Sequence, residues 1–312
     1  MPGFIRSAPP TVLIIAIGLL VGVSFTLSKF VALAEVPPHI ALFWQVAVAS
    51  AVLVGVLVAK GTAPQTAPRY MVYYLGAGLL GVSLPGLIGY VALGHVTTGF
   101  YSALVTLSPM FTFAITAAVE RRMLPVHRLL GILVGLAGIS LATLRGLDTS
   151  DIEPVWIILA LAGPLVLASG NVFRSRVYPS GAEPMTLAAG TLFLQLALIG
   201  AGLLFTGRLA ESSSLEPRAF AAIVGVGFIT AISYALTFEV QRRTDGVGFS
   251  QVGYFATLSG IFFGAITFGE TISQTFVAAL VLIFTGLAIT NGHLSIPRAW
   301  FAARARRRPD CI

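Results

Sequence analysis

Charged residues are scarce in this chain of 312 residues, since Asp, Glu, Lys and Arg together make up 10% of it. Soluble domains carry about a quarter of their residues as charges. Hydrophobic residues account for 56% and the mean hydropathy is +0.92. The composition therefore excludes an ordinary soluble domain and predicts an integral membrane protein.

Cysteine and clustered metal ligands are also lacking. The one cysteine, Cys311, stands next to the end of the chain, so a disulfide framework is not expected. The four histidines are scattered among different segments. No Gly-x-x-x-x-Gly-Lys-[Ser/Thr] motif occurs, which excludes an ATPase in this chain alone. We expect no metal and no cofactor.

Long apolar runs fill the chain instead. A helix needs roughly 20 apolar residues to cross the hydrocarbon core of a bilayer. The sequence predicts an all-α integral membrane fold with ten transmembrane helices. The predicted spans are 11–33, 39–59, 70–93, 98–119, 127–144, 155–173, 185–205, 219–238, 248–268 and 274–290.

The basic residues predict the orientation, because Lys and Arg stay on the cytoplasmic side of short loops. With ten spans and both termini in the cytoplasm, fifteen of the 19 basic residues fall inside. We therefore predict a multi-pass protein of the inner (plasma) membrane. The net charge of +7 is then explained by this topology and by anionic lipid headgroups, so no nucleic-acid partner is expected.

The two ends of the chain are interpreted separately. Residues 293–312 form a basic tail that we expect to lie on the inner lipid surface. Arg6, the first apolar run and Ala32-Leu33-Ala34 resemble a signal peptide. However, this run is longer than a signal core and Lys29 precedes the supposed cleavage site, so we expect it to remain as the first helix.

The two halves of the chain resemble each other. Lys29 and Pro37 after the first span are matched by Arg176 and Pro184 after the sixth. The predicted repeats are 1–145 and 155–292, each with five helices, and an odd number requires that they insert with opposite sense. Inverted repeats are typical of secondary transporters with a site near the middle of the membrane, although channels also contain them.

The ordered motifs resemble the drug/metabolite transporter superfamily, in its EamA-type branch. The residues that carry this resemblance are Gly22-Val23-Ser24-Phe25, Lys29, Pro37-Pro38, Tyr90, Gly99–Ser102, Leu107-Ser108-Pro109, Glu120, Gly135–Gly138, Tyr234, Phe268-Gly269-Glu270 and Thr285-Gly286. The resemblance implies two EamA repeats and transport of small metabolites, often export, through a central cavity. The chain departs from the family at Gln45, where an arginine is frequent, and at Leu258-Ser259-Gly260, which lacks the proline matching Pro109.

Polar side chains in the middle of spans are candidates for that cavity, because a polar group in hydrocarbon is costly unless it meets protein or water. Asn171 and Gln195 rank first, since an amide is the most costly to leave unpaired, and Ser24 and Ser108 follow. The alternative role for each is a hydrogen bond between helices.

Aromatic residues could form the cavity wall and add a hydrogen-bonding tip. The candidates are Phe25, Trp44, Tyr90, Tyr234 and Tyr254, with Gln45 beside Trp44. For Trp44 a place in the interfacial aromatic belt is an equal alternative.

Acidic residues are missing from the centre of every predicted span. A buried carboxylate is the usual proton or sodium carrier of a coupled pump, so its absence makes a facilitator plausible. We expect Glu239 to form a surface ion pair with Arg242 and Arg243, and Lys29 to extend outward from the end of its helix.

The sequence therefore predicts a secondary transporter, with export as the implied direction, rather than an enzyme. Its substrate would be a small metabolite such as an amino acid, moved by alternating access. A passive channel or facilitator is the first alternative, and a lipid-acting membrane enzyme is the second. The substrate, the coupling ion and the oligomeric state stay open.

Overall fold

The computed structural model is helical throughout the residues that it describes, which are 8–121, 123, 126–145, 153–244, 249 and 251–290. No strand occurs among them. The predicted basic tail and most of the predicted linker between the repeats lie outside the described residues.

The described helices follow the predicted spans closely. They are α2 (Pro10–Leu33), α3 (Pro38–Ala59), α4 (Pro68–Gly78), the π-helix η1 (Leu79–Ser83), α5 (Leu84–Leu93), α6 (Thr98–Val105), α7 (Ser108–Val119), α8 (Val126–Arg145), α9 (Pro154–Val177), α10 (Pro184–Phe205), the 3-10 helix η3 (Arg208–Ser214), α11 (Pro217–Arg243), α13 (Val252–Phe268) and α14 (Gln274–Thr290). Six of them begin at a proline, whose missing N–H and fixed φ suit the first helical position.

Seven helical segments among the described residues are long and apolar enough to cross a membrane. They are Pro10–Leu33, Pro38–Ala59, Pro68–Leu93, Thr98–Val119, Pro154–Val177, Pro184–Phe205 and Pro217–Arg243. Leu129–Gly138, Val252–Phe268 and Gln274–Ile289 are shorter apolar helices. The count of ten spans therefore stays a prediction.

Two helix ends were predicted too early. The sixth predicted span stops at residue 173, whereas α9 continues to Val177, and the eighth stops at 238, whereas α11 continues to Arg243. A charged residue follows each predicted end, and charged residues look like loop residues on an apolar scale. In the structure Arg174 and Glu239 are helical and buried, with 3% and 2% of their surface exposed.

Two predicted spans are interrupted. Between α4 and α5 the chain forms the π-helix η1, and α6 ends one turn before α7 begins. A proline follows each interruption, Pro85 after η1 and Pro109 at the start of α7. Proline removes a backbone donor and clashes with the carbonyl four residues before it, which breaks the regular hydrogen-bond ladder.

The chain divides into two compact units, the first comprising residues 1–116 and 150–271 and the second 117–149 and 272–312. In the second unit α8 and α14 pack against each other. Gly286 of α14 lies so close to α8 that an added Cβ would meet the backbone of Gly131 and Gly135. This close approach fits the packing role of small residues at helix interfaces.

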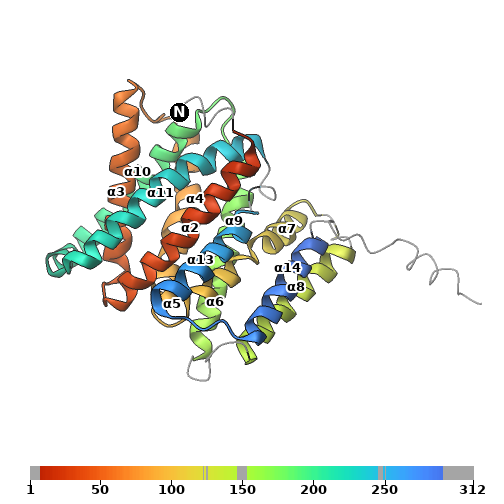
Figure 1. Ribbon diagram of the computed structural model, residues 1–312. Coiled ribbons are helices and arrows are strands. Elements are labelled where there is room, and N and C mark those ends of the chain that lie inside the picture. The colour runs from red at the N-terminus through yellow and green to blue at the C-terminus, as the bar shows by residue number, and fades with distance from the viewer. Residues whose placement is uncertain are drawn as a thin grey trace, which may run out of the picture. The chain divides into compact units, whose positions relative to one another are not determined.

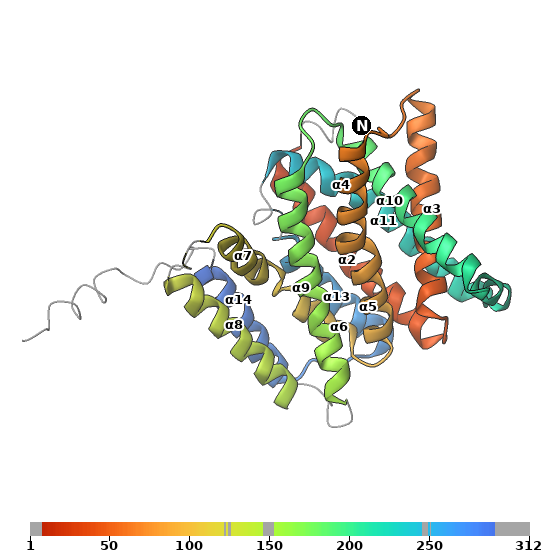
Figure 2. The same cartoon turned by 180° about the vertical axis from the view of Figure 1, so that it is seen from behind.

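In the first unit α2 contacts both α11 and α13, while α3 packs against both α10 and α11 (Figure 1). Seen from behind, α9 lies along α5 and α4 (Figure 2). Gly18 and Gly22 of α2 allow this packing, since a Cβ on either would meet Phe255 or Ser259 of α13. Because α2 also contacts α5 and α6, the helices around it come from both halves of the sequence.

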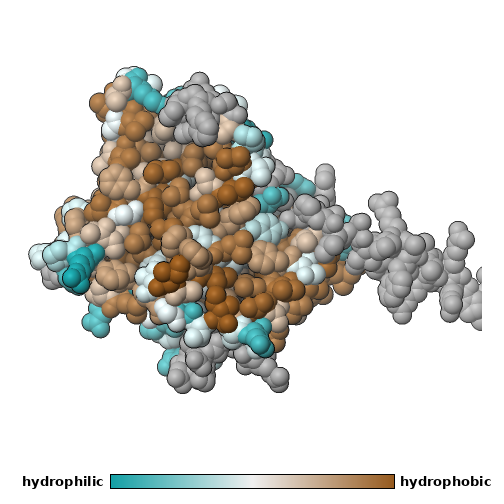
Figure 3. Space-filling view, viewed as in Figure 1, coloured by the Kyte–Doolittle hydropathy of each residue, from teal (hydrophilic) through white to brown (hydrophobic). Residues whose placement is uncertain are grey.

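Hydrophobic residues cover much of the surface shown in Figure 3. Large apolar side chains such as Leu19, Phe193 and Phe262 are 48%, 56% and 58% exposed. Soluble monomers rarely expose so much contiguous apolar surface, whereas lipid accepts it. The exposed surface thus agrees with the apolar composition.

Candidate functional site

A cavity of about 210 Å³ lies inside the first unit. One water molecule requires roughly 10–15 Å³ on this measure, so the cavity has room for a small metabolite. Its wall is formed by Ile17, Val21, Ser24, Phe25 and Ser28 of α2; Gln45 of α3; Gly81 and Val82 of η1; Pro85, Gly86, Gly89, Tyr90 and Leu93 of α5; Tyr101 and Val105 of α6; Ser108 of α7; Leu167, Asn171 and Arg174 of α9; Val226, Ile229, Thr230, Ser233, Tyr234 and Thr237 of α11; Phe249; and Val252, Gly253 and Ala256 of α13.

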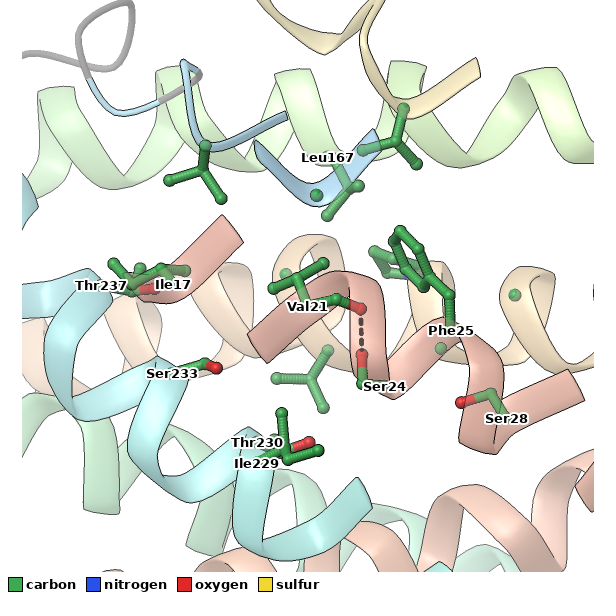
Figure 4. Close-up of a pocket in the computed structure, with 18 of the residues that line it drawn as sticks. Ile17, Val21, Ser24, Phe25, Ser28, Leu167, Ile229, Thr230, Ser233 and Thr237 are labelled. Carbon is green, nitrogen blue, oxygen red and sulfur yellow. Dashed lines mark hydrogen bonds between the residues drawn. The ribbon is translucent and has the colours of Figure 1, made fainter. Parts of the chain in front are cut away.

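Helical periodicity explains how α2 and α11 contribute a face each. The lining residues of α2 recur at intervals of three or four positions, and so do Thr230, Ser233 and Thr237 of α11 (Figure 4). Two of these hydroxyls bond to their own helices, Ser24 to the Val21 carbonyl at 2.7 Å and Thr230 to the Val226 carbonyl at 2.8 Å. Ser233 is 6% exposed, and its hydroxyl has no hydrogen-bond partner among the described residues.

Gln45 connects three helices at the wall. Its Nε2 donates to Thr230 Oγ1 at 2.9 Å, and its Oε1 accepts from the Tyr90 hydroxyl at 2.8 Å. The amide and the phenol thereby satisfy each other inside the protein. This network positions polar groups beside the cavity without leaving a charge there.

The interruption at η1 leaves the backbone carbonyl of Gly81 without its usual helical donor at the cavity wall. Pro85 has no N–H to reach the carbonyl of Gly81, four residues earlier. The Tyr234 hydroxyl of α11 donates to that carbonyl instead. An added Cβ on Gly81 would meet Nη1 of Arg174, so only glycine leaves room for the guanidinium here.

Arg174 is the one lysine or arginine among the residues that line the cavity. Its Nη2 donates to Asn171 Oδ1 at 2.8 Å and its Nε to Gln241 Oε1 at 3.1 Å. Asn171 in turn donates to Ser108 Oγ at 3.5 Å. Neutral amides thus hold the guanidinium in place, and no described carboxylate forms an ion pair with it.

Sequence reasoning missed Arg174 and counted it as a cytoplasmic loop residue. One signal could have identified it: Arg174 follows Asn171 by three positions, which places both on one face of a helix. The predicted span ended at residue 173, so Arg174 was not treated as part of the helix.

Seven of the ten predicted cavity residues line this cavity. They are Ser24, Phe25, Gln45, Tyr90, Ser108, Asn171 and Tyr234. Phe25 packs edge-to-face on Tyr101, with 5.2 Å between ring centroids. The structure brings these residues together from both halves of the chain.

Three predicted residues are not brought to the cavity. Gln195 is fully buried in α10, where its Oε1 accepts from Ser83 Oγ at 2.5 Å. Trp44 packs edge-to-face against Phe43 and Phe220, at 5.4 and 5.5 Å between centroids. Tyr254 of α13 is half-buried and absent from the lining. For Gln195 the geometry favours the alternative role of a bond between helices.

The expectation that Lys29 extends outward is wrong. Its Nζ lies 2.8 Å from Glu270 Oε1 and 3.3 Å from the Val96 carbonyl, and its side chain is 12% exposed. Glu270 also accepts from the backbone N–H groups of Thr98 and Gly99 at 2.7 and 2.9 Å. The lysine turns inward because this carboxylate, which also caps the start of α6, provides a counter-charge.

Glu239 forms the expected ion pair with Arg242 and Arg243, but its carboxylate is buried and not at the surface. The Glu239 side chain is 2% exposed, and it accepts from Arg242 Nη2 at 2.8 Å and from Arg243 Nε at 2.7 Å. Arg243 also donates to the Ala8 carbonyl at 2.9 Å. The carboxylate can be buried because the two arginines of the extended α11 cover it.

No Asp or Glu occurs among the cavity-lining residues, and the described part of the chain contains no group of His, Cys, Asp and Glu that could hold a metal ion. The described wall of the cavity is therefore apolar and hydroxyl-lined, and it contains a single cationic side chain.

Comparisons with known proteins point to one family. The model described as the EamA-like transporter family matches residues 9–144 and again 154–292. The chain is 25% identical over 277 residues to "Uncharacterized transporter YvbV" of Bacillus subtilis (strain 168), covering 86% of this chain and 87% of that protein. It is 28% identical over 203 residues to "Uncharacterized transporter YcbK" of the same organism, covering 62% and 64%.

A solved crystal structure has the same fold, with a TM-score of 0.62 and 19% identity over 95% of this chain and 99% of that one. The family matches span most of the chain, and the apolar helices are those of a multi-pass membrane protein. This chain therefore belongs to the EamA-like transporter family.

Proposed function

We propose that this protein is a secondary transporter that exports small metabolites, such as amino acids and related compounds, by alternating access through the cavity of the first unit. Membership of the family implies transport of a small molecule across a membrane. The class of metabolite, the direction and the mechanism are the parts that we add.

One observation carries the proposal. The cavity wall is built from helices of both matched segments, with α2, α3, α5 and α6 from the first and α9, α11 and α13 from the second. A site shared between two repeats is the arrangement in which each repeat can close one side in turn. The apolar wall with a few placed polar groups is typical of small-molecule sites.

The architecture that we propose has ten transmembrane helices in two inverted five-helix repeats, residues 1–145 and 155–292, in the inner membrane. Both termini would then lie in the cytoplasm, as the distribution of Lys and Arg favours. A reporter active only outside the cytoplasm should stay silent when fused to the C-terminus, and a strong signal there would overturn this orientation.

A facilitator without ion coupling is the second candidate. It is favoured by the lack of Asp and Glu among the cavity-lining residues, since proton- or sodium-coupled carriers commonly use an intramembrane carboxylate. In that case a proton gradient would not change the level to which a neutral substrate accumulates.

The proposal is tested by counterflow in proteoliposomes with a panel of labelled amino acids and related metabolites. A carrier loaded with unlabelled substrate takes up the label transiently above equilibrium, whereas a channel does not. Gln45→Ala should slow this uptake, because it removes the amide that joins Tyr90 to Thr230.

The matched control is Gln274→Ala, which removes an exposed amide at the start of α14. It should leave counterflow unchanged. Absence of counterflow for the whole panel with correctly folded protein would contradict carrier function. Equal rates in wild type and Gln45→Ala would contradict the assignment of this cavity to the transport path.

A further inference from the structure

The cation in the cavity wall is held only by neutral groups. Arg174 is 3% exposed, and its hydrogen bonds go to the side-chain oxygens of Asn171 and Gln241. These bonds use Nη2 and Nε. Nη1, which lies over Gly81, makes no hydrogen bond with any described residue.

A guanidinium held in this way has hydrogen-bond partners but no opposite charge among the described residues. A buried charge is costly unless it is both hydrogen-bonded and paired with an opposite charge. Amide oxygens satisfy some guanidinium donors but provide no net negative charge. An anion that enters the cavity would therefore gain a charge-assisted hydrogen bond from a guanidinium that is largely shielded from solvent.

Three other cations near the ends of these helices each lie beside a carboxylate. Lys29 meets Glu270, and Arg242 and Arg243 meet Glu239. Where the chain needs a cation for structure, it provides a carboxylate. Arg174 lacks one among the described residues, although it lines the cavity.

The guanidinium is also held in a fixed orientation. Asn171 is itself bonded to Ser108 of α7, and the missing Cβ of Gly81 lets Nη1 approach that residue closely. The hydroxyl of Ser233, without a partner among the described residues, lines the same cavity. A ligand oxygen could thus meet a preformed cation and a free hydroxyl.

We propose that the cavity binds substrates through a carboxylate that pairs with Arg174, so that the transported molecules are small organic carboxylates with an apolar body. The inference rests on the proposed transport function and names its substrate class. Side chains such as Val21, Phe25 and Ile229 would contact the apolar body.

The charge count favours a carboxylate over a phosphate monoester. Arg174 is the single Lys or Arg of the lining residues, so a dianion would leave one negative charge without a partner. No Asp or Glu is found among the described lining residues to pair with an ammonium group. We therefore expect the carboxylate to be required, and an amino group to be tolerated but not necessary.

The experiment compares three acids with their primary amides, which have nearly the same shape: 3-phenylpropionate, 4-methylpentanoate and leucine. Binding to the purified full chain is measured by calorimetry, and uptake is measured in proteoliposomes. We expect at least one acid to bind about tenfold or more tightly than its amide, the size typical of a hydrogen bond to a charged group.

The variant Arg174→Gln should remove this preference. Because the preference is a ratio within one variant, it does not depend on how much protein folds. The matched control Arg176→Gln removes an exposed arginine from the same turn of α9 and should keep the preference. Asp245, which lies outside the described residues, is tested by Asp245→Asn, which should also keep it.

The outcomes separate the two proposals. Equal binding of every acid and its amide in the wild type, or an unchanged preference in Arg174→Gln, would overturn the carboxylate site. A marked rise in acid affinity in Asp245→Asn would reveal an internal counter-ion and overturn it as well. Uptake of an amide as fast as its acid would support the proposed transport function and contradict the proposed carboxylate site. Tight, Arg174-dependent acid binding without uptake would support the site and contradict transport.

Discussion

Two cations of the first unit, the partly buried Lys29 and the buried Arg174, have opposite surroundings. Lys29 lies 2.8 Å from the Glu270 carboxylate, which in addition accepts two backbone N–H groups at the start of α6. Arg174 is bonded to two neutral side-chain oxygens and faces the cavity. Both are cations within apolar helices, yet the protein provides a counter-charge for only one of them among the described residues.

This difference separates a structural charge from one that is available to a ligand. Removing one partner of a buried ion pair leaves the other charge uncompensated, which is strongly destabilising. Removing a cation that has no internal partner leaves no such charge behind. The two sites should therefore respond to substitution in different measurements, one in folding and the other in ligand selection.

The largest effect is expected for Glu270→Gln. It leaves Lys29 without its counter-ion and weakens the cap of α6, so we expect a loss of about 3–5 kcal/mol of stability. Unfolding of the purified protein in detergent measures it. Glu216→Gln, which changes an exposed carboxylate that makes no helix cap, is the control. Equal stability of wild type and Glu270→Gln would show that the pair has no structural role.

A smaller effect is expected for Gly81→Ala, and on ligand selection rather than on folding. The added Cβ would meet Nη1 of Arg174 and the Tyr234 hydroxyl, both at the far ends of side chains, so we expect these two groups to shift while the helices stay in place. The preference for acids over amides should fall even though Arg174 is still present.

The control for Gly81→Ala is Gly55→Ala in α3, where an added Cβ meets nothing within 4 Å. This control should keep the preference and gain up to about 1 kcal/mol of helix stability. A preference that Gly81→Ala leaves intact would mean that the position of the guanidinium does not matter for ligand selection.

The smallest effect is expected for the stability of Arg174→Gln. The substitution removes the two hydrogen bonds that Arg174 donates to the side-chain oxygens of Asn171 and Gln241, each worth about 1 kcal/mol. It also removes the cost of a buried charge without a partner. The net change should stay within about 1 kcal/mol of the wild type. A loss of stability as large as that expected for Glu270→Gln would show that Arg174 has a structural role, and Lys29 and Arg174 would then not differ in function.

Sequence reasoning placed the helices well but could not rank the polar residues within them. Asn171 and Gln195 looked equivalent, since both are amides in the middle of an apolar span. The structure places Asn171 in the cavity wall and Gln195 in a buried bond with Ser83. The direction in which each side chain faces depends on the rotation of its helix, and nothing within one apolar span specifies that rotation.

The same limit explains the charged residues. Glu270 and Lys29 are 241 positions apart in sequence, and Arg174 meets Gly81 only because α9 lies along η1. A pattern search along the chain sees each of these residues as the end of a helix. Their partners belong to elements that fold against them from the other half of the sequence.

The sequence by itself determined that this is a helical membrane protein of the EamA-like transporter family, because the bilayer demands long apolar segments whose backbone bonds are satisfied within each helix. Only the tertiary structure decided which polar groups meet, which cation has a counter-ion and which one faces a cavity. Those outcomes depend on contacts between distant helices, where close packing and paired polar groups select one arrangement among many that are equally apolar.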